Sequence, residues 1–120
     1  MRVWLTLYGA VLVCLCVVPI VSAQDAVKVD PKHYSVVSEN DKVRILRVHY
    51  GAHEKSEMHS HPNSVAIFQN DTRCRFTFPD GKTEEHSFRA GETLFTPAGS
   101  HLPQNLSDQP IDLILVELKR

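Results

Sequence analysis

The sequence predicts an all-β fold, a sandwich or barrel of short strands, for residues 24–120. Short runs rich in β-branched and aromatic residues follow one another at close spacing, and Gly, Pro, Asn and Asp separate them. None of these runs carries the period of an amphipathic helix. The expected strands cover residues 42–50, 65–69, 73–78, 83–88, 93–96 and 111–118.

One hairpin is the best-defined part of the predicted fold. In residues 73–78 apolar and polar side chains alternate, so the apolar ones share one face of a strand. The sequence P-D-G-K at 79–82 predicts a tight turn, because glycine adopts a positive φ angle without steric cost. Residues 83–88 are then expected to return as the partner strand. Cys74 lies on the apolar face and is expected to be a core thiol.

Glycine and proline also divide the second half of the chain into strands. Turns are expected at 89–92 and 97–99, where Gly91 and Gly99 would supply positive φ angles. The final run, 111–118, is apolar on both faces, which is typical of a buried strand.

Residues 1–23 have the composition of a secretory signal peptide. A minimal basic start precedes an apolar run over 3–18, and Pro19 and small residues follow it. Cleavage is expected after Ala23, which predicts a secreted or periplasmic protein with one domain over 24–120. The alternative is an uncleaved membrane anchor, since the apolar run approaches the length that spans a bilayer.

The expected mature chain has 97 residues, enough for one domain with a single, modest core. Without Arg2 it has twelve Lys and Arg against fourteen Asp and Glu, a net charge of −2. This excludes a strongly basic nucleic-acid surface. Cys74 is its one remaining cysteine, so no internal disulfide is expected. The strands at 42–50 and 111–118 carry more apolar surface than one interior needs, and a homodimer is expected to cover it.

Three histidines form the candidate site. His59 and His61 are separated by one residue, so on a strand their side chains point to the same face. The turn at 97–99 is expected to bring His101 alongside from a neighbouring strand. The three imidazoles are therefore predicted to bind one divalent metal ion, each through a ring nitrogen at roughly 2.0–2.2 Å.

The histidines and the residues around them resemble the two motifs of the cupins, small jelly-roll β-barrels. In the second motif the family order is kept, although one residue fewer separates the second glycine from the histidine. The resemblance extends from about 36 to 118 and is nearest to the small, single-domain bacterial cupins of the RmlC-like superfamily. It implies a cupin-type double-stranded β-helix, a metal in the barrel mouth and frequent dimers. The matching residues of the second motif are Gly91, Pro97, Gly99, His101 and Asn105.

The first cupin motif is less complete. Gly51 stands two residues too far from His59, and the closing glycine is replaced by the turn residues Asn70-Asp71. The motif's metal-binding glutamate would fall at Val65 or Ala66, neither of which can bind a metal.

Three neutral imidazoles without a carboxylate keep the full dipositive charge of the ion and leave more coordination positions open. Cupin dioxygenases of the cysteine dioxygenase type resemble this arrangement, and the same ligands also suit zinc with a bound water. The metal is expected to be Fe, Mn, Ni or Zn. Two functions remain open: a small-molecule metalloenzyme such as a dioxygenase or isomerase, or a non-catalytic small-molecule or metal-binding module with a degenerate site.

The remaining histidines and several other polar residues are expected to lie outside the metal site or at its edge. His53 is either a fourth ligand or a solvated loop residue, and Glu57 is expected at the rim of the site on the face of His59. Tyr50, Arg73 and Arg75 are candidates for a pocket only if their side chains point inward. Strand alternation places the two arginines on the strand face opposite that of Cys74. The remaining histidines of the mature chain are expected on strand surfaces: His33, His49 and His86.

Overall fold

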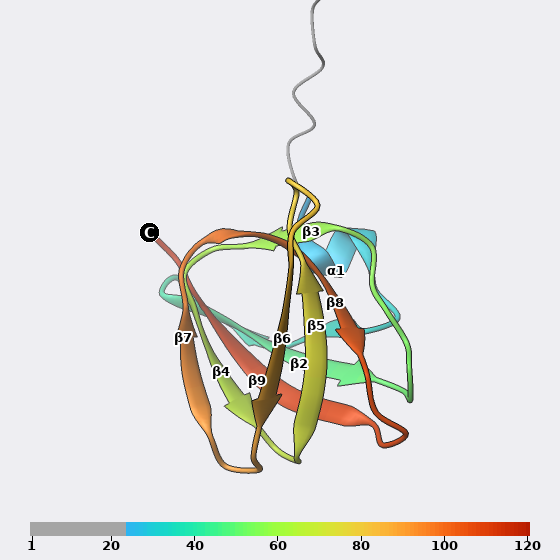
Figure 1. Cartoon of the computed structure of the whole chain (residues 1–120). Helices are drawn as coiled ribbons and strands as arrows, with labels where there is room; N and C mark the ends of the chain where they lie inside the picture. Colours follow the sequence, from blue (N-terminus) through green and yellow to red (C-terminus); the bar gives the residue numbers. More distant parts are fainter. Residues whose placement is uncertain (1–23) are drawn as a thin grey trace, which may run out of the picture.

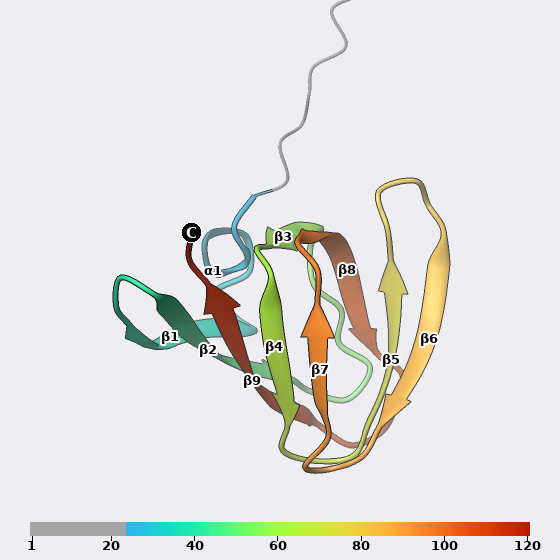
Figure 2. The same cartoon turned by 90° about the vertical axis from the view of Figure 1, so that its left-hand side faces the viewer.

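The computed structural model describes residues 24–120, and the predicted signal peptide lies outside the described residues. Within this range the chain forms two β-sheets that face each other across a common interior (Figure 1, Figure 2). The five-stranded sheet has the order β1-β2-β9-β4-β7, and the four-stranded sheet has the order β3-β8-β5-β6. Because consecutive strands often lie in different sheets, residues far apart in sequence meet in the interior.

All six predicted strands are present, with ends that differ by no more than one residue from the prediction. Most of these strands lie between two neighbours or in a tight hairpin, where alternation and turn signals are strong. The last strand, β9, pairs with β2 on one side and β4 on the other. The confirmed strands are β2 (Val43–Tyr50), β4 (Ser64–Phe68), β5 (Thr72–Thr77), β6 (Thr83–Phe88), β7 (Thr93–Thr96) and β9 (Ile111–Leu118).

Three strands and one helix were not predicted as such. The edge strand β1 (Tyr34–Glu39) buries only its first residue, so its sequence carries little apolar alternation. β3 (His59–His61) is too short for a pattern, as is the single turn of helix α1 (Ala26–Val29). β8 (Gly99–Asn105) contains a proline, which usually argues against an internal strand because it lacks an N–H donor.

The glycine expectations are confirmed at one turn and wrong at another. Gly91 has a φ of 86°, as expected, and Gly81 in the P-D-G-K turn has a φ of 85°. Gly99 does not belong to this class, because among residues 24–120 only those two glycines have positive φ. Gly99 instead begins β8 in an extended conformation and pairs with His61.

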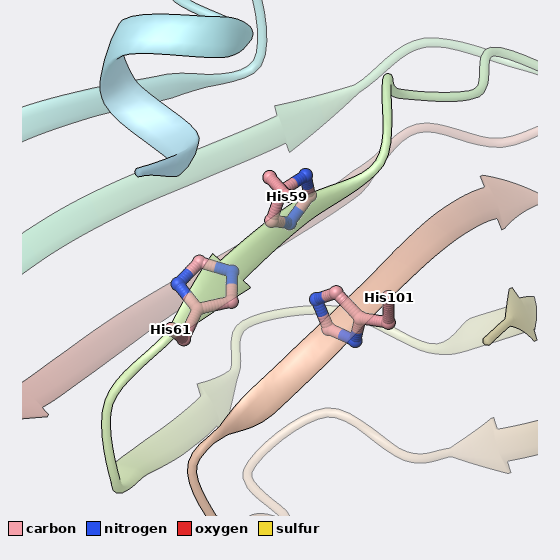
Figure 3. A group of neighbouring side chains, drawn as sticks. All are labelled: His59, His61 and His101. Carbon is pink, nitrogen blue, oxygen red and sulfur yellow. The ribbon is translucent and has the colours of Figure 1, made fainter. Parts of the chain in front are cut away.

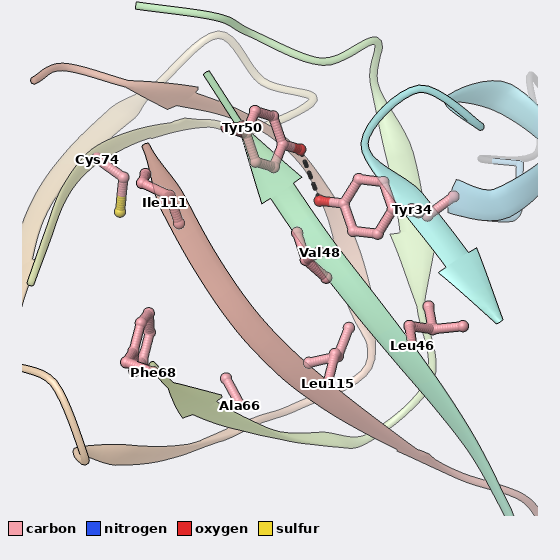
Figure 4. Packing of buried hydrophobic residues seen from close by; sticks show 10 residues of the cluster. Tyr34, Leu46, Val48, Tyr50, Ala66, Phe68, Cys74, Ile111 and Leu115 are labelled. Carbon is pink, nitrogen blue, oxygen red and sulfur yellow. Dashed lines mark hydrogen bonds between the residues drawn. The ribbon is translucent and has the colours of Figure 1, made fainter. Parts of the chain in front are cut away.

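The core lies between the sheets, on the inner faces of the long strands (Figure 4). Cys74 is 4% exposed and belongs to this cluster, which confirms the expected core thiol. Burial raises the pKa of its thiol to about 12, so the thiol stays protonated near neutral pH. The buried cluster also includes Leu46, Val48, Tyr50, Phe68, Ile111 and Leu115.

Candidate metal centre

Strand pairing brings the three predicted histidines together. β3 runs antiparallel to β8, with His59 directly opposite His101. The candidate ligand atoms of His59, His61 and His101 all lie within 4.8 Å of one another (Figure 3). The ring centroids are 4.8 Å apart for the two β3 histidines and 4.9 and 5.2 Å from these to His101. The i, i+2 spacing and the neighbouring strand therefore produce the cluster expected from the sequence.

A backbone carbonyl orients His59. Its Nδ1 lies 2.9 Å from the carbonyl oxygen of Glu57, which can only accept a hydrogen bond. Nδ1 therefore carries the proton, and Nε2 keeps its lone pair. The imidazole is fully buried, and this burial is the main reason that its pKa falls to about 4. His59 is thus neutral at pH 7, the form that binds a metal ion.

A buried carboxylate orients His61. Nδ1 of His61 lies 2.7 Å from Oε2 of Glu117, which comes from β9 in the opposite sheet. Glu117 is 1% exposed, and its other oxygen accepts a hydrogen bond of 2.7 Å from Nε of Arg44. Arg44 also forms an ion pair with Asp25, just before α1. The chain Asp25–Arg44–Glu117–His61 directs Nε2 of His61 away from Glu117, as the outer partners of metal-binding histidines do.

Packing rather than hydrogen bonding holds His101. Its ring stacks on Phe76 at 5.1 Å with an interplanar angle of 7°. Burial, followed by the proximity of His61 and His59, lowers the pKa of His101 to about 3. His101 is therefore also neutral at pH 7.

The nitrogen atoms of this cluster fit a metal ion. Among the described residues, Nε2 of His59 and Nε2 of His101 are the only buried side-chain nitrogen or oxygen atoms without a hydrogen-bond partner. Leaving a buried polar atom unpaired costs about 1–3 kcal/mol. A divalent ion would use both of these lone pairs together with that of His61, and the three-histidine group can therefore hold one.

His61 and His101 open onto a cavity of about 80 Å³ between the sheets. Its lining is mostly apolar and includes Phe68 and Phe76, together with His61 and His101. Tyr34 also lines it and packs edge-on against His59 with ring centroids 4.8 Å apart. A ligand in this cavity would therefore contact both the metal site and an apolar interior.

Solved structures of other proteins share this fold. A cupin domain from Bordetella pertussis superposes with a TM-score of 0.68 at 19% identity, over 72% of this chain and 92% of that chain. An RmlC-like cupin with a double-stranded β-helix fold from Methanocaldococcus jannaschii superposes with a TM-score of 0.57 at 15% identity, over 71% and 77%. This is the cupin fold. No protein-family description and no curated protein sequence matches the chain.

The other histidines of the described chain lie outside the cluster of His59, His61 and His101. His53 is exposed in a loop and bonded to Asp108, 2.6 Å away, so it lies outside the cluster. His49 and His86 are on strands near the surface, as expected. The expectation for His33 is wrong: it is 6% exposed, precedes β1, and its Nδ1 lies 2.6 Å from a carboxylate oxygen of Asp30.

The remaining polar candidates also have definite places. Glu57 lies before β3 rather than on it, and its carbonyl, not its carboxylate, serves the site. Tyr50 faces inward and lines the cavity. Arg73 and Arg75 do not line it; they bond to Leu106 and Glu85 near the surface, consistent with strand alternation.

Sequence reasoning missed three residues of the site: Tyr34, Arg44 and Glu117. A signal for Glu117 existed, because a charged residue two positions after Leu115 shares the inner face of a strand. Arg44 likewise lies two positions before the buried Leu46 on β2, so the two side chains share a strand face. Tyr34 lies on the edge strand that the sequence did not predict, so it carried no comparable signal.

Proposed function

We propose that the protein is an exported, metal-dependent cupin in which His59, His61 and His101 together bind one divalent ion. The observation that carries this proposal is the convergence of three imidazoles, two of which have buried Nε2 atoms without a protein partner. The ion would be Fe, Mn, Ni or Zn, since imidazole accepts each of them. The cavity beside the site supports a small-molecule ligand rather than a macromolecular one.

The reaction classes that suit this site are oxygenation and isomerisation of a small organic molecule. Bound there, the metal would supply Lewis acidity or redox chemistry. The chain's own residues would orient the imidazoles and exclude bulk water: Glu57 and Glu117 hold the two β3 rings, and Phe76 covers His101. The alternative is a module that binds the metal or a small molecule without turnover.

Metal titration of the purified protein tests the proposal. Calorimetry with Mn²⁺, Fe²⁺, Ni²⁺ and Zn²⁺ should give one ion per chain for the parent and loss of most binding for His101→Ala. The matched control is His86→Ala, because His86 lies near the surface on β6 outside the cluster. Binding by the triple alanine variant as tight as by the parent would show that the site is wrong. A parent that binds none of these ions would favour a metal-free binding module.

Export is proposed from residues 1–23, which match a signal peptide in charge, apolar core and end. Within residues 24–120, no helix is long and apolar enough to cross a bilayer. Expression with the native leader should yield protein whose N-terminal sequence starts at Gln24. Protein that retains Met1 in the membrane fraction would contradict cleavage and favour an anchor.

A homodimer is proposed through the outer face of the five-stranded sheet. Paired positions form an apolar row across four strands: Ile45 opposite Val116, Val116 opposite Val65, and Val65 opposite Phe95. Phe95 is 57% exposed, which is unusual for a large aromatic side chain. Light scattering should give twice the chain mass at micromolar concentration, and Phe95→Arg should reduce it to one chain. A monomeric parent would contradict the dimer.

A further inference from the structure

The cavity beside the histidines lacks a charged partner for an anionic or cationic ligand. Among the described residues that line it, none is Lys, Arg, Asp or Glu. It follows β8, because both His101 and Asn105 line it, and the register places Asn105 opposite Cys74. The cavity therefore extends from the metal site into the apolar core.

Three of the polar side chains in its wall, those of Asn105, Thr72 and Thr96, are already engaged by the protein. The amide nitrogen of Asn105 donates to the carbonyl oxygens of Gly51 and Gln109, at 3.0 and 2.7 Å. Thr72 and Thr96 each donate their hydroxyl proton to a backbone carbonyl oxygen, at 3.3 Å. None of these three side chains has a donor left for a ligand.

The two tyrosines are engaged in a chain of hydroxyl groups. The hydroxyl oxygens of Tyr34 and Tyr50 are 2.7 Å apart (Figure 4), and Tyr50 also bonds to Ser56. Ser56 donates to the carbonyl oxygen of Glu57, at 2.8 Å. One of the two tyrosine hydroxyls donates to the other. Burial raises the pKa of both hydroxyls, so both tyrosines stay uncharged near neutral pH and neither brings a charge to the cavity.

The remaining polar groups of the lining are the imidazole nitrogens, which a metal would occupy, and Gln104, whose amide is uncharged. We propose that this cavity takes an uncharged, largely apolar small molecule that binds the metal through a single donor atom and places its body along β8. This inference rests on the proposed metal site and specifies its ligand class.

A second charge on the ligand would be buried without a partner. Moving an ionised group from water into an apolar site is strongly unfavourable unless it is paired and hydrogen-bonded. A carboxylate or ammonium group next to Phe68 or Cys74 would meet no oppositely charged side chain among the described residues that line the cavity. Amino acids and organic phosphates therefore do not fit this cavity, whereas short alcohols, phenols and thiols do.

Binding of two matched thiols to the Co²⁺-loaded protein tests the inference. Propane-1-thiol and 3-mercaptopropionate share the metal-binding head and differ at the far end, where the second carries a carboxylate. Coordination of a thiol changes the visible spectrum of Co²⁺, which gives the dissociation constant directly. Propane-1-thiol is expected to bind at least about tenfold more tightly, because the carboxylate lacks a partner. 3-Mercaptopropionamide, which has the size of the acid without its charge, separates charge from bulk and should bind more tightly than the acid.

A variant that fills the cavity tests whether the ligand binds inside it. Ala66 is 5% exposed and lines the cavity, so Ala66→Leu should weaken propane-1-thiol binding while Co²⁺ stays bound. The matched control is Ala90→Leu in an exposed turn, which should bind both as the parent does. Equal or tighter binding of 3-mercaptopropionate, or unchanged thiol binding by folded, Co²⁺-loaded Ala66→Leu, overturns the ligand class alone. Failure of the parent to bind Co²⁺ overturns the metal site and the ligand class together.

Discussion

The two strands that supply the histidines hold them by different means. On β3, hydrogen bonds to Glu57 and Glu117 fix the outer ring nitrogens of His59 and His61. On β8, Nε2 of His101 has no hydrogen-bond partner within residues 24–120, and the ring is held by its stack on Phe76. The β3 side of the site therefore depends on charge and hydrogen bonding, and the β8 side depends on packing. Substitutions on the two sides should therefore fail in different ways.

Removal of Glu117 should have the largest effect. Glu117→Ala leaves Arg44 with Asp25 alone and should destabilise the protein by about 3–5 kcal/mol, because it breaks a buried ion pair. The isosteric Glu117→Gln should fold better and weaken metal binding by about 10–100-fold, as loss of a ligand's outer partner does.

Urea unfolding and metal titration measure these two effects. The control is Glu85→Ala, which breaks an exposed pair with Arg75 and should change stability by no more than about 0.5 kcal/mol. Unchanged metal affinity in Glu117→Gln would mean that the carboxylate does not act through His61.

The metal-free protein should lose stability in mild acid. The folded-state pKa values of His59 and His101, about 4 and about 3, lie below the usual value of 6.5. Between pH 6.5 and about 4 the unfolded chain therefore binds more protons than the folded one, and stability falls as pH falls. These two groups should together cost about 3 kcal/mol between pH 6.5 and 5.

Urea unfolding at several pH values checks this slope. A variant with both His59→Asn and His101→Asn should show a shallower dependence, whereas His86→Asn should keep that of the parent. A parent whose stability does not change between pH 6.5 and 5 would contradict the burial argument for the two imidazoles.

Loss of the aromatic stack should have a smaller effect. Phe76→Leu keeps an apolar side chain but removes the ring that covers His101, and stability should fall by about 1 kcal/mol. Metal affinity should fall by less than in Glu117→Gln, because His101 keeps its lone pair. Phe88→Leu is the matched control: its ring stacks on Phe68 and His86, so metal affinity should stay at the parent value.

The smallest effect on metal affinity is expected from Asp25, at the outer end of the hydrogen-bonded series Asp25–Arg44–Glu117–His61. The hydrogen bond from Arg44 is the main reason that the pKa of Asp25 lies below its usual value, so Asp25 is ionised at pH 7. Asp25→Asn removes this charge but leaves Arg44 on Glu117, and metal affinity should fall only about two- to fivefold. Asp41→Asn, which alters an exposed carboxylate beside Lys42, serves as the control in the same titration. An effect as large as that of Glu117→Gln would contradict this order.

Much of the fold and the ligand triad could be predicted from local patterns. The P-D-G-K turn and the alternation of residues 73–78 define the β5–β6 hairpin by themselves. The His59, His61 pair shares a face by strand geometry alone.

The rest depends on contacts between distant segments. Glu117 reaches His61 only because β9 and β3 lie in facing sheets, and no local pattern reports that pairing. His33 looked like a surface histidine because its partner, Asp30, belongs to a turn before an edge strand with little apolar alternation. Gly99 looked like a turn residue because Pro97 stands two positions before it. Its pairing with His61 on β3 instead keeps its backbone extended.

X-ray absorption at the metal edge of the Zn²⁺-loaded protein tests the central claim most directly. The spectrum should show three imidazole nitrogens at roughly 2.0–2.1 Å from the zinc, with oxygen completing its ligands and no sulfur among them. The absence of sulfur follows because Cys74 is buried in the core and lies outside the cluster. Any zinc that His101→Ala still binds should have two imidazole ligands. A parent with one imidazole or none, or with a sulfur ligand near 2.3 Å, would contradict the three-histidine centre.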